Sequence, residues 1–158
     1  MLRSDRLAQK LTIGIPALLL AGAYIGELAF GLYPCEMCWW QRWPHFAALA
    51  LGLISGVVAF PRLVIGLAAL SILVSGLIGG FHAGVEYGWW EGITGCATAI
   101  AEGESALNAI LNAPLVRCDQ APWSLLGVSL AGWNFLVSCG SAIAIVALLG
   151  KGRKVGIE

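Results

Sequence analysis

Four long apolar stretches, separated by short polar or charged segments, constrain this chain more than any other feature. They run over residues 11–30, 43–60, 63–85 and 131–149. A helix that crosses the hydrocarbon core of a bilayer needs roughly 20 consecutive apolar residues. The chain of 158 residues is 59% hydrophobic and only 11% charged, which is far from the composition of soluble domains. We therefore predict an all-α integral membrane protein, a four-transmembrane-helix bundle that forms one domain over residues 1–158.

The composition also excludes two other classes of chain. Intrinsic disorder requires low hydrophobicity and high net charge. Nucleic-acid binding requires a basic surface, whereas here nine Lys and Arg residues balance nine Asp and Glu residues. We therefore expect the lipid bilayer as a partner and no nucleic acid.

The positions of the basic residues predict which way the bundle faces. Seven of the nine lie at the termini or at the corner between the second and third spans: Arg3, Arg6, Lys10, Arg62, Lys151, Arg153 and Lys154. An even number of spans puts these places on one side, and short loops rich in Lys and Arg face the cytoplasm. Both termini are therefore predicted to be cytoplasmic, and the loops at 31–42 and 86–130 to face the outer side. All seven tryptophans lie at or near the outer ends of spans, as interfacial aromatic residues do.

The first span has an alternative interpretation as a cleaved signal peptide. Basic residues precede it, and residues 21–23 are small enough for a cleavage site. The apolar sequence continues to Phe30, which favours a retained helix. Cleavage would leave the orientation of the other spans unchanged.

Small residues recur within the spans. Gly52 and Gly56 are four residues apart, as are Gly76 and Gly80. Such spacing lets helix backbones approach each other. We predict packing within one bundle, with a dimer interface as the alternative. Cys139, alone in the fourth span, is expected to be a packing residue as well.

The other four cysteines fall in the two outer loops and allow three interpretations. Cys35 and Cys38 form a Cys-x-x-Cys in the first loop, and Cys96 and Cys118 lie in the second. The interpretations are two structural disulfides, which an oxidising outer compartment permits, a four-thiolate metal site, and a redox relay. The metal site lacks a second closely spaced pair, so no metal is predicted. A bridge across two residues removes little unfolded-chain entropy and is more often reactive, which favours the relay.

Arg42 is the one basic residue of the first outer loop and follows Cys38 by four positions. If a helix begins just upstream, the two side chains share a face, and Pro44 is expected in the first helical turn. A guanidinium and a helix N-terminus both stabilise a thiolate. We interpret Arg42 as holding an anion, either the thiolate or a reduced electron acceptor. The alternative is a charge that extends to the lipid headgroups. Glu36, between the two cysteines, would oppose a low thiol pKa.

A dithiol made by oxidising a partner must pass on two electrons, and the chain offers no carrier of its own. It has no dinucleotide fingerprint and no cluster spacing, and Trp39 rather than His follows Cys38, which excludes c-type haem attachment. The acceptor should be lipid-soluble and lie at the outer edge of the bilayer. A quinone fits that requirement.

The first-loop sequence at residues 34–42, Pro-Cys-Glu-Met-Cys-Trp-Trp-Gln-Arg, resembles the signature of the disulfide bond formation protein B (DsbB) family. Further similarity lies in the four spans, in the second cysteine pair and in residues 81–90 at the end of the third span. Residues 123–127, leading to Trp133-Asn134, are also similar. The resemblance covers nearly the whole chain beyond Lys10.

This resemblance implies a membrane thiol:quinone oxidoreductase of the bacterial cell inner membrane, with its active cysteines facing the periplasm. A periplasmic, DsbA-like thioredoxin-fold oxidant would exchange disulfides with the Cys96–Cys118 pair, and Cys118 would then attack Cys35. That attack would leave Cys38 as a thiolate against ubiquinone or menaquinone from the membrane quinone pool. Arg42 would favour the anion.

The resemblance also assigns His82 to quinone binding. From the residues alone, His82 is more readily interpreted as a hydrogen-bonded interfacial histidine, and His45 as a structural one. The resemblance further implies a short interfacial helix in the second outer loop, at about Ala101–Asn112. That loop is acidic, which favours a partner with a basic rim.

Four alternatives compete with the general relay. One is a dedicated variant that serves one specific oxidant or exported substrate. Another is a vitamin K epoxide reductase-type enzyme, whose reactive pair lies in a late span. A third is a non-catalytic membrane assembly protein with structural disulfides. The last is a transporter, for which Glu27 alone within a span is weak support.

Overall fold

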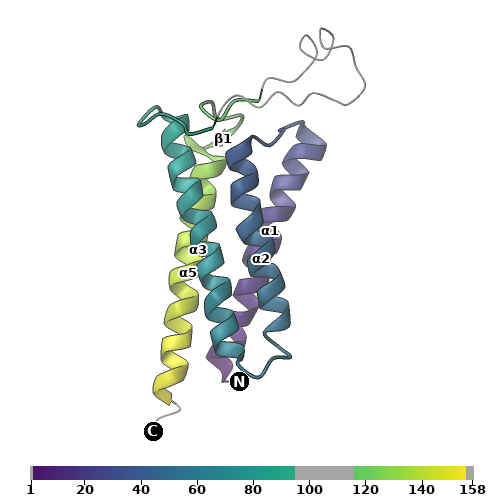
Figure 1. Cartoon of the computed structure of the whole chain (residues 1–158), viewed down its shortest axis with the longest axis vertical. Coiled ribbons are helices and arrows are strands. Elements are labelled where there is room, and N and C mark those ends of the chain that lie inside the picture. Colours follow the sequence, from purple (N-terminus) through teal and green to yellow (C-terminus); the bar gives the residue numbers. More distant parts are fainter. Residues whose placement is uncertain (1, 95–115, 156–158) are drawn as a thin grey trace.

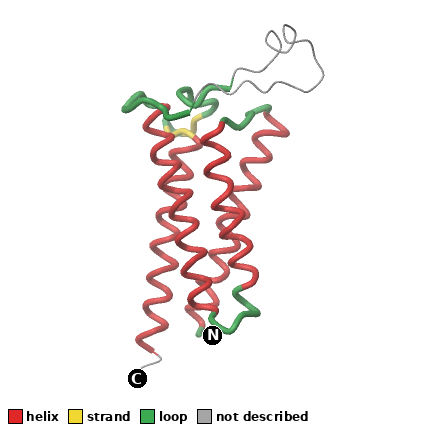
Figure 2. Tube along the Cα trace, in the orientation of Figure 1, coloured by secondary structure: helices red, strands yellow, loops and turns green. Residues whose placement is uncertain are grey.

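The computed structural model describes residues 2–94 and 116–155, and this part of the chain consists of four helices and one short hairpin (Figure 1). The helices are α1 (Arg3–Phe30), α2 (Glu36–Ile54), α3 (Pro61–Glu86) and α5 (Leu130–Val155). The strands are β1 (Ser124–Leu125) and β2 (Val128–Ser129). The four helices run side by side as an up-and-down bundle (Figure 2). The prediction of an all-helical membrane-type bundle is therefore confirmed at this level.

The two ends of the bundle differ in what they carry (Figure 1). The N-terminal end of α1, the C-terminal end of α5 and the α2–α3 connection lie at one end. The α1–α2 connection, the segment after α3 and the hairpin lie at the other. We call the latter the cysteine end, because Cys35 and Cys118 pack together there. This grouping matches the predicted one, while the side of the membrane that each end faces stays a prediction.

Three helices of the described chain are long and apolar enough to cross a membrane. They are Arg3–Phe30, Pro61–Glu86 and the Leu130–Lys151 part of α5. The second predicted span, at 43–60, differs in its bounds from α2, which begins seven residues earlier and ends at Ile54. α2 is not among these three, because polar residues such as Gln41 and Arg42 fill its first turns.

The early start of α2 has a local cause. Cys35 is extended, with φ −77° and ψ 176°, and its side chain caps the helix by accepting the backbone N–H of Cys38. Pro44 consequently lies inside the helix and not in its first turn, which corrects the expectation. A proline at this position has no backbone N–H, so the carbonyl four residues before it receives no helical hydrogen bond from the proline.

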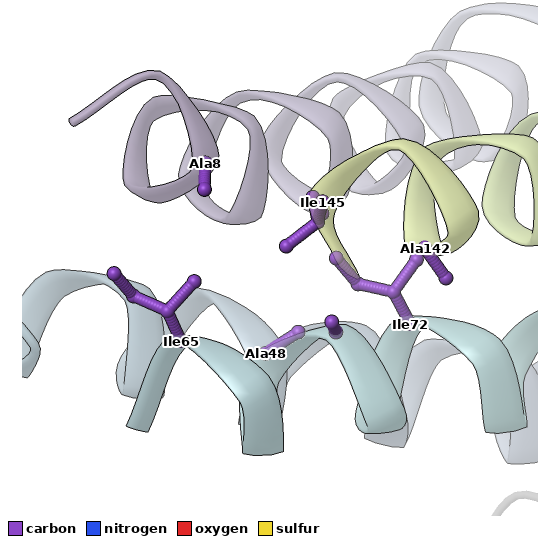
Figure 3. Packing of buried hydrophobic residues seen from close by; sticks show 7 residues of the cluster. Ala8, Ala48, Ile65, Ile72, Ala142 and Ile145 are labelled. Atoms are coloured by element: carbon purple, nitrogen blue, oxygen red, sulfur yellow. The ribbon is translucent and has the colours of Figure 1, made fainter. Parts of the chain in front are cut away.

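Small residues, alanine and glycine, let the helices approach closely. The core cluster consists of Ala8, Ala48, Ile65, Ala69, Ile72, Ala142 and Ile145 (Figure 3). A Cβ added to Gly52 would lie 2.9 Å from the Ile13 side chain of α1. A Cβ added to Gly76 would lie 2.8 Å from Cys139 Sγ of α5. The predicted role of these glycines and of Cys139 in packing within one bundle is confirmed.

The ends of the bundle are tied by polar contacts. Away from the cysteines, Arg62 Nε lies 3.6 Å from Oδ1 of the buried Asp5, which joins α3 to α1. At the cysteine end, the Tyr87 hydroxyl accepts the backbone N–H of Ser129 at 2.9 Å, which joins α3 to the hairpin. The hairpin turn has positive φ at Leu126 (55°) and Gly127 (78°), as a type I′ turn requires. Cys96 and the helix expected at 101–112 lie outside the described residues.

Candidate functional site

The first turn of α2 brings the two sulfur atoms of the Cys-x-x-Cys together. Cys35 Sγ and Cys38 Sγ are 2.9 Å apart, and both are free thiols. The backbone N–H of Cys38 donates to Cys35 Sγ at 3.2 Å. Cys35 is only 3% exposed, whereas Cys38 is partly exposed. The pair is therefore asymmetric, with one buried sulfur and one accessible sulfur.

The electrostatics of the pair are asymmetric as well. Cys35 and Cys38 both lie before residues 43–60, the second predicted membrane span. The hydrogen bond from the Cys35 side chain holds the pKa of Cys38 below its ordinary value, although burial acts in the opposite direction. The positive charge of Arg42 adds a smaller lowering effect. The same hydrogen bond, together with burial, raises the pKa of Cys35. Of the two sulfurs, Cys38 is therefore the one at which the thiolate form is favoured, and Cys35 is the one at which it is disfavoured.

Cys118, from the segment before the hairpin, lies against the buried sulfur. Its side chain packs with Cys35 in a cluster that also holds Met37 and Val85. Thr94 Oγ1 donates to Cys118 Sγ at 3.2 Å. The structure therefore brings three of the four predicted relay cysteines into one cluster, although Cys118 is far from Cys35 in the sequence.

His82, near the C-terminal end of α3, faces the same cluster. Its Nε2 lies 3.6 Å from Cys35 Sγ and 3.7 Å from Glu86 Oε1. Its Nδ1 lies 2.9 Å from Nε2 of Gln41. His82 is 2% exposed, and the Glu86 side chain is equally buried. Oε2 of Glu86 lacks a hydrogen-bond partner within the described part of the chain.

A chain of polar side chains continues from His82 into the bundle. Gln41 Oε1 accepts from Asn134 Nδ2 at 2.8 Å, and Asn134 Oδ1 lies 2.9 Å from His45 Nε2. Ser75 Oγ donates to the Gln41 carbonyl at 2.8 Å. These residues come from α2, α3 and α5, so the network links three helices. His45 belongs to it, in agreement with the structural role expected for it.

Arg42 has a partner that the sequence interpretation missed. Its Nη1 donates to Glu27 Oε2 of α1 at 2.7 Å. The guanidinium carbon lies 4.8 Å from the ring centroid of Tyr24 and 5.0 Å from that of Trp39. With only 7% of its side chain exposed, Arg42 is enclosed and not extended toward the surface. From the sequence alone Glu27 is only weak support for a transporter, although an acidic residue within an apolar span is itself a signal for a basic partner.

Glu36 does not oppose the thiolate as the sequence suggested. Its side chain is exposed, whereas its neighbours Cys35 and Met37 are buried. It is the first residue of α2, where a negative charge interacts favourably with the helix dipole. The buried carboxyl of Glu86 is the acidic group that raises the Cys38 pKa.

Three of these groups could also be considered as metal ligands. Cys35 Sγ, Cys38 Sγ and a ring nitrogen of His82 all lie within 4.8 Å of one another. Two thiolates and an imidazole suit zinc or copper(I). The spacing of cysteines along the chain could not indicate this set, because His82 comes from another helix.

The comparisons with known proteins agree with the resemblance noted in the sequence. The sequence model of the family "Disulfide bond formation protein DsbB" matches residues 5–148. "Disulfide bond formation protein B" of Verminephrobacter eiseniae (strain EF01-2) is 30% identical over 162 residues, covering 93% of this chain and 86% of the relative. The protein of the same name from Polaromonas sp. (strain JS666 / ATCC BAA-500) is 30% identical over 161 residues, covering 91% and 88%.

A third relative is "Disulfide bond formation protein B 2" of Pseudomonas aeruginosa (strain PAO1), which is 27% identical over 156 residues. The alignment covers 88% of this chain and 90% of that protein. No solved structure matches the chain. The family match spans nearly the whole bundle, including α2 with its cysteines. The chain therefore belongs to the disulfide bond formation protein DsbB family.

Proposed function

We propose that the chain is a thiol:quinone oxidoreductase that generates disulfides for a periplasmic, DsbA-type thioredoxin-fold oxidant. It lies in the bacterial inner membrane with its cysteine end facing the periplasm. Cys35, Cys38, Cys96 and Cys118 are its catalytic residues. Membership of the family supports the disulfide-forming activity, and the apolar helices support the membrane location.

The observation that carries the proposal is the packing of Cys118 against Cys35, with Cys38 Sγ only 2.9 Å from Cys35 Sγ. Thiol–disulfide exchange requires the attacking sulfur to reach one sulfur of a disulfide while the other departs. Here the attacked position, Cys35, is the buried sulfur between the other two. Cys38 is suited to depart, because its pKa is lowered by the hydrogen bond with Cys35.

The relay then follows with balanced electrons. A thiolate of the reduced oxidant first attacks Cys96 of the Cys96–Cys118 disulfide, which forms a mixed disulfide with Cys96 and leaves Cys118 as a thiolate. The Cys118 thiolate forms a bond to Cys35, and the electron pair of the Cys35–Cys38 bond passes to Cys38. The second thiol of the oxidant attacks the mixed disulfide and releases Cys96, and the Cys96 thiolate then attacks Cys118, which restores the Cys96–Cys118 disulfide and frees Cys35. When Cys35 and Cys38 are joined again, the pair gives up two electrons and two protons in total to a quinone.

The residues beside Cys38 fit a quinone. The accessible Cys38 lies one helical turn from Arg42, whose guanidinium is flanked by the Tyr24 and Trp39 rings. Aromatic faces suit a flat ring, and the guanidinium suits an oxygen that gains negative charge. A bound ubiquinone or menaquinone supplies a lipid-soluble acceptor for two electrons and two protons. We assign Arg42, His82 and Cys38 to its binding site.

Trapping the disulfide between Cys35 and Cys118 tests this proposal. In Cys38→Ser the Cys35 thiol has no cysteine partner in its own loop, so it can attack Cys118 of the Cys96–Cys118 disulfide, form a Cys35–Cys118 bond and release Cys96 as a thiolate. Without Cys38 this bond cannot be exchanged back into a Cys35–Cys38 disulfide. We expect mass spectrometry of oxidised, thiol-blocked and proteolysed Cys38→Ser protein to show a Cys35–Cys118 peptide. The matched control, Cys38→Ser with Cys118→Ala, should show none. If Cys38→Ser keeps the Cys96–Cys118 disulfide and a free Cys35 thiol, the chain is a membrane assembly protein with structural disulfides.

A further inference from the structure

The buried amide of Gln41 has only one orientation that satisfies its neighbours. Its Nε2 lies 3.1 Å from the Met37 carbonyl oxygen, and its Oε1 lies 2.8 Å from Asn134 Nδ2. A carbonyl oxygen only accepts hydrogen bonds, so the group that faces Met37 must be the NH₂ of the amide. The reverse orientation would oppose two oxygens at Met37 and two NH₂ groups at Asn134.

Asn134 is fixed independently by a second backbone carbonyl. Its Nδ2 lies 3.2 Å from the carbonyl oxygen of Ser75. Its Oδ1 accepts from the Ser138 hydroxyl at 2.8 Å. Two carbonyl groups on different helices, those of Met37 and Ser75, therefore set the same direction for the whole chain of amides.

The consequence falls on His82. Gln41 Nε2 lies 2.9 Å from His82 Nδ1, and an amide nitrogen can only donate. His82 Nδ1 must then supply the lone pair, which puts the proton of the neutral imidazole on Nε2. That N–H faces Cys35 Sγ at 3.6 Å and Glu86 Oε1 at 3.7 Å. We infer that Gln41 is a positioning residue that holds His82 as a hydrogen-bond donor toward the sulfur of Cys35.

This tautomer changes what the cluster can do. A metal ion bound with Cys35 and Cys38 would need a lone pair on His82 Nε2, and that atom carries the proton. The Gln41 network therefore opposes metal binding at these three residues. For the same reason His82 cannot take a proton from the Cys35 thiol through Nε2.

The N–H is instead placed to stabilise a departing Cys35 thiolate, and this step rests on the proposed function. When an incoming thiolate attacks Cys118 in a Cys35–Cys118 disulfide, it forms a bond to Cys118. The electron pair of the broken bond passes to Cys35. A hydrogen bond from His82 Nε2 stabilises the new negative charge.

The tautomer can be measured directly, because the chain has only two histidines. We would label the full-length protein with [¹⁵N]histidine in detergent micelles and record the ring nitrogen shifts. Both rings should carry the proton on Nε2, since His45 Nε2 lies 2.9 Å from the accepting Asn134 Oδ1. A wild-type His82 with its proton on Nδ1 would overturn the inference, whether or not the protein reduces quinone.

Variants of Gln41 separate positioning from general packing. Gln41→Leu removes the donor, so His82 should become a mixture of tautomers, while His45 reports that the bundle remains folded. Gln41→Glu offers only acceptors when ionised and should move the proton to Nδ1. Ser138→Ala, which loses one contact to Asn134 but leaves Gln41 in place, should change neither ring. An unchanged His82 in Gln41→Leu would contradict the assignment.

A second readout tests the effect on Cys35 without any quinone. We would trap the Cys35–Cys118 disulfide in a Cys38→Ser background and follow its reduction by dithiothreitol. Gln41→Leu should slow this reduction by about tenfold, equivalent to about 1.4 kcal/mol. The Ser138→Ala control should match its parent. Equal rates with and without Gln41 would overturn the role of the hydrogen bond at Cys35.

Discussion

Arg42 on α2 and Glu27 on α1 form an ion pair of 2.7 Å that is largely enclosed between the two helices. The positive charge beside the reactive cysteines is therefore already balanced by a carboxylate. An anion that develops near Cys38 would share Arg42 with Glu27 and would not meet a free cation. This pairing makes α1, which carries no cysteine, part of the candidate site.

Glu27→Gln should destabilise the bundle. Removing one partner of a buried ion pair costs about 3–5 kcal/mol, and the partial exposure of Glu27 puts the expected loss at or below the lower limit. We would follow thermal unfolding in detergent by circular dichroism. The matched control is Glu36→Gln, at an exposed carboxylate, which should change the midpoint little. Equal midpoints for the two variants would show that the Glu27–Arg42 pair does not contribute to stability.

Arg42→Lys should weaken the use of quinone while the protein stays folded. Lysine keeps the positive charge but loses the planar fork of donors and the ability to stack between Tyr24 and Trp39. We expect the apparent KM for quinone to rise several-fold in steady-state assays. An apparent KM equal to that of the wild type would remove Arg42 from the proposed quinone site.

The reactivity of Cys38 should extend to lower pH than that of an ordinary cysteine. Its lowered pKa, caused first by the hydrogen bond with Cys35, means that the thiolate fraction rises and levels off earlier as pH increases. Because the folded pKa lies below the unfolded one, the thiolate contributes stability above the unfolded value, and this stability is lost as pH falls through the folded pKa. The check is the pH profile of iodoacetamide labelling at Cys38 in fully reduced protein.

The matched variant for that profile is Cys35→Ala, which removes the first cause of the shift. Its labelling curve should move to higher pH. A curve that stays in place would mean that the hydrogen bond within the pair does not lower the pKa of Cys38.

Gly84→Ala should disturb the C-terminal end of α3. A Cβ at this position would lie 2.0 Å from the ring of Trp90, which stacks on Phe81 and donates to the Phe81 carbonyl. We expect a lower unfolding midpoint and altered tryptophan fluorescence. Gly66→Ala on the same helix has open space around it and should raise helix propensity without a clash. Similar midpoints for the two alanine variants would contradict the close packing of Trp90.

Much of this architecture could be predicted from hydropathy, because four apolar stretches with polar ends leave few ways to fold. The bounds of α2 could not, since they depend on the cap formed by Cys35 and on a proline tolerated inside the helix. The hairpin was also missed, because its Leu126-Gly127 turn lacks the asparagine or aspartate that usually marks such turns.

The candidate site was predictable only in part for a different reason. The Cys35–Cys38 pair and Arg42 are neighbours on one helix, so their spacing in the sequence indicates their proximity. The contacts of Cys118 with Cys35 and of His82 with Gln41 join distant segments. No local pattern in a single sequence indicates such contacts. Cys118 is a candidate because it lies in a predicted outer loop, whereas for His82 only the family resemblance points to the site.

Quinone reduction by the purified full-length protein, given a reduced thioredoxin-fold oxidant, tests the central claim most directly. Cys38→Ser should abolish the turnover seen in the wild type. Cys139→Ser, which changes a cysteine that packs against Gly76 away from the cluster, should retain it. Turnover that survives in Cys38→Ser, or no turnover in the wild type with either ubiquinone or menaquinone, would contradict the account.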